Sequence, residues 1–149
     1  MAIFREDPYP ALNFEVTITG ISDDGRAVRG SFADVSGLEI SVDVIEYRNG
    51  SEDLTVRKLP GTRKYTNITL KRGVIGDLTF WNWMQSVIEG RHIRAAGTIA
   101  LLDESRQEVM RWSFRRGWPC KITGPVLNAK ANEVAMETLE ICHEGLEVA

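Results

Sequence analysis

A mainly β protein with one α-helix and one long β-hairpin is the fold class that this sequence predicts. Three observations support it: segments in which apolar and polar residues alternate, short connections rich in Gly, Pro, Asn and Asp, and a single stretch with helical spacing. Successive strands without helices between them pair antiparallel. We therefore expect a small antiparallel β-sandwich or barrel, formed by a single domain over residues 1–149.

The longest alternating stretch, from Val35 to Gly61, predicts a hairpin with one apolar and one polar face. The expected apolar face consists of Leu38, Ile40, Val42, Val44, Leu54 and Val56, and the polar face of Glu39, Ser41, Asp43, Thr55 and Arg57. We expect a tight turn at Asn49-Gly50, which accepts positive φ, and the end of pairing at Pro60-Gly61. Because unpaired strand edges promote aggregation, we interpret this hairpin as a seam with a neighbouring subunit.

The other strands are expected at Leu12–Thr19, Val28–Phe32, Tyr65–Lys71, Ile93–Leu102, Glu108–Arg116 and Val134–Cys142. In the fifth of these, Gly117-Trp118-Pro119 is expected to end the strand. In the last, the apolar residues change phase near Glu137 and Thr138. This leaves two alternatives, a β-bulge at that point or a strand buried on both faces.

The helix is expected from Leu78 to Glu89, with Asp77 capping its first amides and Gly90 ending it. Its core-facing side chains are Phe80, Trp83, Met84 and Val87, which fall on one stripe at helical spacing. Trp81 and Ile88 widen that stripe, so we expect the helix to be covered on more than one side.

Bulk composition excludes several classes of protein. The net charge of −3 argues against a dedicated nucleic-acid binder, which needs a basic face. No apolar run approaches the ~20 residues of a membrane-spanning helix, and the N-terminus lacks the apolar stretch of a signal peptide. We therefore expect synthesis and folding in the cytoplasm, with Cys120 and Cys142 as free thiols.

No pattern indicates catalysis, a metal or a cofactor. The zinc-type ligands are His92, Cys120, Cys142 and His143, and adjacent strand residues such as the last two point to opposite faces. Neither histidine lies near a recognisable nucleophile motif, so we expect no enzymatic activity. The basic and aromatic stretch from Arg111 to Trp118 resembles a single-strand binder, but alternation separates its rings from its guanidinium groups.

Ten fragments, in order, carry a family resemblance over about 140 positions. They are Asp7-Pro8-Tyr9, Asn13-Phe14-Glu15-Val16, Val35-Ser36-Gly37-Leu38, Ile45-Glu46-Tyr47-Arg48, Lys58-Leu59-Pro60-Gly61, Asn67-Ile68-Thr69-Leu70-Lys71-Arg72-Gly73, Trp81-Asn82-Trp83, Trp118-Pro119, Leu127-Asn128-Ala129-Lys130 and His143-Glu144-Gly145-Leu146-Glu147. In these the chain resembles the inner tube proteins of contractile phage tails and phage-tail-like injection systems, the T4-like tail tube family.

The resemblance implies hexameric rings that stack into a hollow tube with a continuous β-barrel around the lumen. It implies as partners further copies of the chain, a sheath protein, baseplate or spike and tube-cap proteins, and a lumenal cargo of protein or DNA. On this hypothesis the polar hairpin face looks into the lumen. The expected contacts between stacked rings are Asp7, Tyr9, Tyr47, Arg48, Glu52 and Asp53.

Two alternatives remain open on the sequence. A small monomeric β-barrel that binds an apolar ligand would also fit alternating strands, but it would need a cavity lined by apolar side chains. Within the tube family, a secreted ring-forming carrier of type VI secretion is possible, although the fragments are closer to the phage-tail and extracellular injection group.

Overall fold

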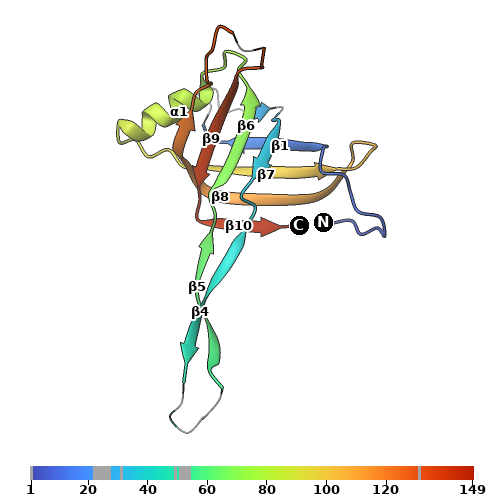
Figure 1. Cartoon of the computed structure of the whole chain (residues 1–149), viewed down its shortest axis with the longest axis vertical. Helices are drawn as coiled ribbons and strands as arrows, with labels where there is room; N and C mark the ends of the chain where they lie inside the picture. The colour runs from blue at the N-terminus through green and yellow to red at the C-terminus, as the bar shows by residue number, and fades with distance from the viewer. Residues whose placement is uncertain (1, 22–27, 31, 49, 51–54, 131) are drawn as a thin grey trace.

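The computed structural model describes residues 2–21, 28–30, 32–48, 50, 55–130 and 132–149. Figure 1 shows a β-rich body from which a two-stranded ribbon projects. The strands are β1 (Phe14–Thr19), β2 (Val28–Gly30), β3 (Asp34–Ser36), β4 (Ile40–Tyr47), β5 (Arg57–Tyr65), β6 (Ile68–Gly73), β7 (Ala95–Leu102), β8 (Glu108–Thr123), β9 (Met136–Cys142) and β10 (Gly145–Val148), and the helix is α1 (Thr79–Ile88). The prediction of a mainly antiparallel β fold with one helix is confirmed for the described residues.

The body is a single antiparallel sheet in the order β2-β1-β7-β8-β9-β6-β3, with β10 paired to β8. Its two halves share the 16-residue strand β8. The first part of β8 pairs with β7 and β10, and the part from Trp118 onward pairs with β9. Between them, Arg116 adopts a positive φ of 52°, which turns the strand from one half to the other.

The prediction that Gly117-Trp118-Pro119 ends this strand is therefore wrong. Pro119 lacks an N–H and weakens a ladder, but here a register shift between Pro119 and Lys121 absorbs the disruption. The strand continues to Thr123 with β9 as its new partner. A proline in this strand marks a bulge and not an end.

The core lies between the two halves of the sheet and α1. It is a cluster of buried side chains from both halves and the helix: Val16, Ile18, Ile68, Leu70, Phe80, Trp83, Ala95, Ile99, Phe114, Leu139, Ile141 and Leu146. Leu12, expected to begin the first strand, is 75 % exposed and precedes β1. The strand begins only at Phe14.

Strand β9 keeps one continuous register with β6. Of the two alternatives expected from the sequence, β9 therefore has no bulge near Glu137 and Thr138, and it is not fully buried on both faces. Glu137, Leu139 and Ile141 are buried and share one face, while the residues between them are half-buried. The apparent change of phase arises because a carboxylate occupies an inward position. The bulge in this pair lies on the partner strand, β8.

Helix α1 begins one residue later and ends one residue earlier than the expected Leu78–Glu89. Asp77 Oδ1 accepts hydrogen bonds from the N–H (3.0 Å) and the hydroxyl (2.6 Å) of Thr79, and these bonds lower the pKa of that carboxyl. Gly90 has φ 85°, and the bond from Arg91 N–H to Ser86 O closes the C-terminus. Phe80 and Trp83 are buried, while Met84 and Val87 are half-buried. Trp81 and Ile88 remain exposed, so the helix is covered on one side only within this chain.

Candidate functional site

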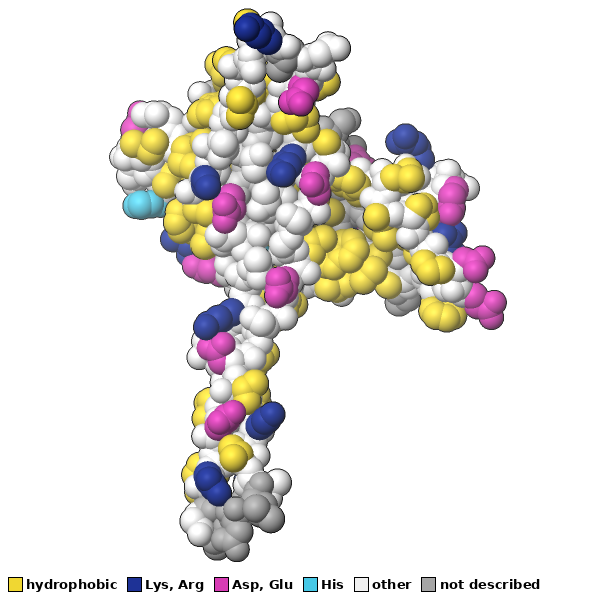
Figure 2. All heavy atoms as spheres, viewed as in Figure 1, with side chains coloured by type: hydrophobic (Ala, Val, Ile, Leu, Met, Phe, Trp, Pro, Cys, Tyr) yellow, Lys and Arg dark blue, Asp and Glu magenta, His cyan; other side chains and the backbone are white. Residues whose placement is uncertain are grey.

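The most prominent feature outside the body is the ribbon of β4 and β5. We call residues 40–65, which comprise these two strands and their connection, the arm. Among the described residues neither strand pairs with a third one, and every residue of β4 is exposed. The exposed side chains include large apolar ones, with Val44 62 % and Ile45 52 % exposed. Figure 2 shows the arm extending away from the body with no covering layer.

The arm pairs differently from the sequence prediction. The two strands are joined through residues 48–56, because the last register pair is Tyr47 with Arg57. This register is not that of a two-residue turn at Asn49-Gly50, and Asn49 itself lies outside the described residues. The strand β5 runs through Pro60 and Gly61, which were expected to end pairing. That part of the prediction is wrong because Val44 pairs directly with Pro60.

A bulge in β5 explains how the arm accommodates these two residues. The register shifts between Val42↔Arg63 and Val44↔Pro60, so Gly61 and Thr62 together oppose Asp43. A Cβ on Gly61 would lie 3.0 Å from Asp43 O and 3.1 Å from Ile45 Cγ1, which is tighter than ordinary contact. Glycine at this position therefore allows the close approach that the bulge requires.

Directly opposed residues in an antiparallel pair share a face, so the register defines the two faces of the arm. The first face holds Ile40, Tyr65, Val42, Arg63, Val44, Pro60, Glu46 and Lys58. The second face holds Ser41, Lys64, Asp43, Ile45, Leu59, Tyr47 and Arg57. On β4 the first face is apolar near the body, at Ile40 and Val42, and acidic farther out at Glu46, whereas the second face is polar near the body, at Ser41 and Asp43, and carries Ile45 and Tyr47 farther out. Apolar character therefore crosses from one face to the other near Val44 and Ile45.

The predicted arm residues take the following places. Ile40, Val42 and Val44 share the first face, and Ser41, Asp43 and Arg57 share the second. Thr55 and Val56 lie beyond the paired segment, Glu39 precedes it, and Leu54 lies outside the described residues. Leu38 is half-buried and packs against the core, so the structure places it in the body.

The root of the arm is tightly held. Gly37, between β3 and β4, has φ 89°, and a Cβ there would lie 2.0 Å from Asn67 O. The N–H of Thr66 donates to Glu39 O at 3.3 Å. The buried ring of His143 contacts the connection between β5 and β6, with its Nε2 3.0 Å from Thr66 O. These contacts fix where the arm leaves the body.

The predicted ring-stacking residues fall into two separate groups. Asp7 and Tyr9 lie in the N-terminal segment beside the body, Tyr47 and Arg48 lie toward the far end of the arm, and Glu52 and Asp53 lie outside the described residues. Figure 1 shows the two groups on different parts of the molecule. A single surface patch cannot contain both.

A residue that the sequence prediction missed, Arg5, orders the N-terminal segment. Its guanidinium donates to both carboxylate oxygens of Glu104 at 2.9 Å and to the carbonyl of Asp7 at 2.7 Å. It also lies 3.9 Å from the centre of the Tyr9 ring. The bidentate contact lowers the pKa of Glu104 to about 2. We call this set of contacts the N-terminal clamp.

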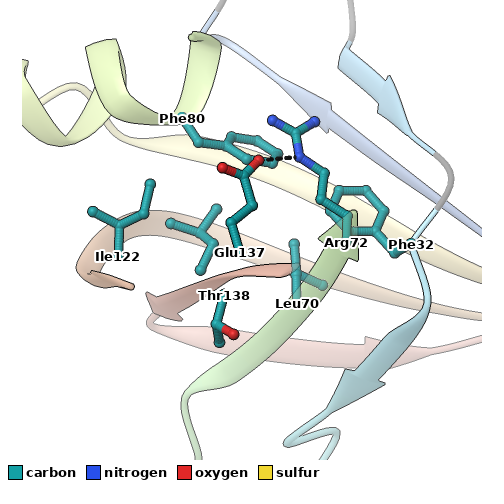
Figure 3. Close-up of a pocket in the computed structure, with 8 residues that line it drawn as sticks. Phe32, Leu70, Arg72, Phe80, Ile122, Glu137 and Thr138 are labelled. Carbon is teal, nitrogen blue, oxygen red and sulfur yellow. Dashed lines mark hydrogen bonds and ion pairs between the residues drawn. The ribbon is translucent and has the colours of Figure 1, made fainter. Parts of the chain in front are cut away.

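A buried ionic network holds α1 against the sheet. Arg72 Nε on β6 donates to Glu137 Oε1 on β9 at 2.6 Å, and Trp81 Nε1 on α1 donates to Glu137 Oε2 at 3.3 Å. The Arg72 guanidinium lies 4.4 Å from the centre of the Phe80 ring. Figure 3 shows Glu137 and Arg72 pointing toward one another, with Thr138 turned the other way. Their partners are internal to the chain, so the network is structural.

The described residues line two open spaces outside the core, one of about 210 Å³ beside Val87, His92, Arg94 and Trp118 and one of about 270 Å³ beside Val126 and Leu127. The space lined by Phe32, Leu70, Phe80 and Leu139 has a volume of about 0 Å³, so it has no room for an apolar ligand. No three His, Cys, Asp or Glu side chains in the described ranges lie close enough to hold a metal. Cys120 and Cys142 are free thiols, and burial raises the pKa of Cys120. The helix found in the described part of the chain is too short and too polar to cross a membrane.

Comparison with protein-family models identifies a family for this chain. The model of the T4-like virus tail tube protein gp19 family matches residues 10–147. A chain in the sheath-tube complex of PVC, an extracellular contractile injection system in the extended state, is 30 % identical over 97 % of this chain and 93 % of that chain, with a TM-score of 0.83.

Two further solved structures are also similar. A chain in the anti-feeding prophage cap is 29 % identical over 100 % of this chain and 95 % of that chain, again with a TM-score of 0.83. Hcp1 from Flavobacterium johnsoniae shares the fold at 14 % identity, over 91 % of this chain and 93 % of that chain, with a TM-score of 0.55. Comparison with curated protein sequences gives no match.

Proposed function

This chain belongs to the T4-like virus tail tube protein gp19 family, and we propose that its copies close into hexameric rings that stack into a hollow tube. It is a tube subunit of a contractile phage tail or an extracellular contractile injection system, a structural protein and not an enzyme. The observation that carries the proposal is the arm, whose strands pair only with each other among the described residues and keep apolar side chains in water. A long exposed ribbon is a liability in a monomer, whereas ring closure covers its edges.

The two faces of the arm suggest different contacts. Near the body, the apolar first face with Ile40 and Val42 packs on the adjacent subunit of the ring. The polar second face there, with Ser41 and Asp43, lines the lumen. Farther out, Ile45 and Tyr47 carry the apolar character on the second face, which suits contact with the next ring. Contacts that repeat head-to-tail along an axis produce a filament.

Further partners follow from the solved relatives. The PVC structure contains sheath and tube, and the anti-feeding prophage structures contain a baseplate, six-fold symmetrised, and a tube-terminating cap. We propose sheath, baseplate or spike, and cap proteins as the partners of this tube. Its lumen then conveys a cargo of protein or DNA, and sheath contraction drives it through the target envelope.

Electron microscopy of the purified chain tests the proposal. The wild-type chain is expected to form rings or rods, and the variant Ile40→Asp/Val42→Asp is expected to remain a 16.7 kDa monomer. The matched control is Ile88→Asp, which places the same charge on an exposed apolar residue of α1 outside the arm. A wild-type chain that stays monomeric at high concentration would refute the proposal. Normal rods from the double variant would refute the role of the first face.

A further inference from the structure

A buried histidine lies at the root of the arm. His143 sits between β9 and β10 and is only 7 % exposed. Its Nε2 lies 3.0 Å from Thr66 O, on the connection between β5 and β6, and its Nδ1 lies 3.1 Å from Gly145 O. Both polar contacts of the ring are therefore with main-chain carbonyl oxygens, which can only accept hydrogen bonds.

A neutral imidazole cannot supply both of these contacts. It carries a single N–H, and its other nitrogen presents a lone pair. One of the two carbonyl oxygens would then face that lone pair, at 3.0 or 3.1 Å, without a donor. A buried acceptor that loses its donor is costly. The doubly protonated imidazolium has two N–H donors and satisfies both carbonyls.

The aromatic rings around His143 also favour a cation. The ring of Tyr65, the last residue of β5, is centred 5.7 Å from the imidazole, and the ring of Phe114 on β8 is centred 6.0 Å from it. Aromatic faces attract positive charge at about this distance. The surroundings of His143 therefore combine two acceptors with two aromatic rings.

Among the described residues, no carboxylate contacts the imidazole. The ionisable side chains on the segments that meet there are Glu39, Tyr65, Arg115, Cys142, Glu144 and Glu147. The carboxylate of Glu144 is bound by Arg94 at 2.9 Å and by Arg116 at 2.6 Å, and Glu147 lies 3.6 Å from Arg115. These two carboxylates already have basic partners, so the carbonyls of Thr66 and Gly145 are the groups that respond to protonation of His143.

We propose that protonation of His143 fixes the root of the arm and that loss of this proton loosens it. The imidazolium joins the segment between β9 and β10 to Thr66, whose N–H donates to Glu39 O just before the arm. Histidine is the side chain that changes charge between roughly pH 5 and 8. The root is therefore held by both bonds at the acidic end of this range and loses one as the pH rises. The contact lies within one copy, so the proposal does not depend on assembly.

Two measurements on the wild-type chain test the proposal. Nitrogen NMR with labelled histidine rings, in solution for a monomer or in the solid state for rods, reports which ring nitrogens carry hydrogen. We expect both nitrogens of His143 to be protonated at about pH 5 and only one at about pH 8. Over the same interval, the protection factor of the Thr66 amide should fall roughly tenfold, once its rate is divided by the intrinsic exchange rate at each pH.

His92→Gln is the matched control, because His92 is the other histidine of the chain and is exposed. This variant should keep the pH dependence at Thr66. In His143→Gln the side chain gains no proton over this interval, so any remaining protection of Thr66 should not vary with pH. If that variant does not fold by circular dichroism, the wild-type and His92→Gln measurements still decide, since they leave the root unchanged.

Three results would overturn the proposal. The first is a His143 ring whose protonation does not change between about pH 5 and 8. The second is protection of the Thr66 amide that does not follow the protonation of His143. The third is a pH dependence at Thr66 that persists in a folded His143→Gln variant. None of these results bears on whether the chain forms rods, so the tube proposal stands or falls separately.

Discussion

Glu137 occupies an inward position of β9 that alternation reserves for an apolar side chain. Its carboxylate accepts hydrogen bonds from Arg72 and from the Trp81 indole, and both charged side chains are less than a tenth exposed. Desolvation makes a buried charge costly unless it is paired and hydrogen-bonded, and here both conditions are met. The network ties β6, β9 and α1 together, so it fixes the angle at which the helix packs on the sheet.

Glu137→Gln is expected to lower the free energy of unfolding, by less than the roughly 3–5 kcal/mol of a fully unpaired buried charge, because Arg72 would keep only its longer ion pair with Asp77 at 3.5 Å. Urea titration followed by tryptophan fluorescence measures this loss. The matched control is Arg72→Met/Glu137→Leu, which removes both charges at similar volume and should cost clearly less than the single change. A single variant as stable as the wild type would show that the pair does not secure the helix.

At the scale of elements, the sequence predicts the periodic features well. Antiparallel strands, the single helix with its Asp77 and Gly90 ends, and a ribbon built around Ile40, Val42 and Val44 all follow from spacing and local chemistry. Prediction fails where tertiary context overrides a local signal. Pro60 and Pro119 interrupt no strand, because bulges next to them let pairing continue with the register shifted by one residue. Alternation alone also could not reveal that Glu137 points inward, since its partner lies 65 positions away.

The root of the arm gives an element-scale prediction. Gly37→Ala places a methyl group against Asn67 O at a positive φ, so the chain must shift where the arm leaves the body. We expect a loss of more than ~1 kcal/mol in stability and fewer rods. The control is Gly50→Ala, where an added Cβ would meet no atom within 4 Å. Equal rod yields from both variants would contradict a defined arm direction.

The N-terminal clamp predicts an acid-dependent change. The pKa of Glu104 is about 2 in the folded chain and 4.5 for the free group, so the folded state binds this proton less readily. The contribution of the clamp is therefore complete above pH 4.5 and is lost as the pH falls toward 2. The protection factor of the Ile3 amide, which donates to Val109 O, should fall over that interval, once its rate is divided by the intrinsic exchange rate at each pH.

In Glu104→Gln the uncharged amide cannot hold Arg5 in the same way at any pH. The protection factor of the Ile3 amide should therefore be low already at neutral pH and change little on acidification. Identical exchange profiles in the wild type and this variant would show that other contacts hold the N-terminal segment.

At the scale of the whole molecule, the body and the arm differ in how far their side chains are buried within one copy. The body has a buried core and internal partners for its buried polar groups, so the single chain can hold its own fold. The described residues of the arm form no buried core, and most of their apolar and charged side chains lie in water within one copy. A free ribbon of two strands is marginally stable on its own, so the tube is expected to complete the arm.

Hydrogen exchange along β4 and β5 tests this central claim most directly. In assembled rods, the amides of residues 40–47 and 57–65 should be protected to the same degree as those of the body strands. In Ile40→Asp/Val42→Asp monomers, the same amides should exchange much faster while the body remains protected. Arm amides that exchange equally fast in rods and in monomers would contradict the claim that neighbouring copies complete the arm.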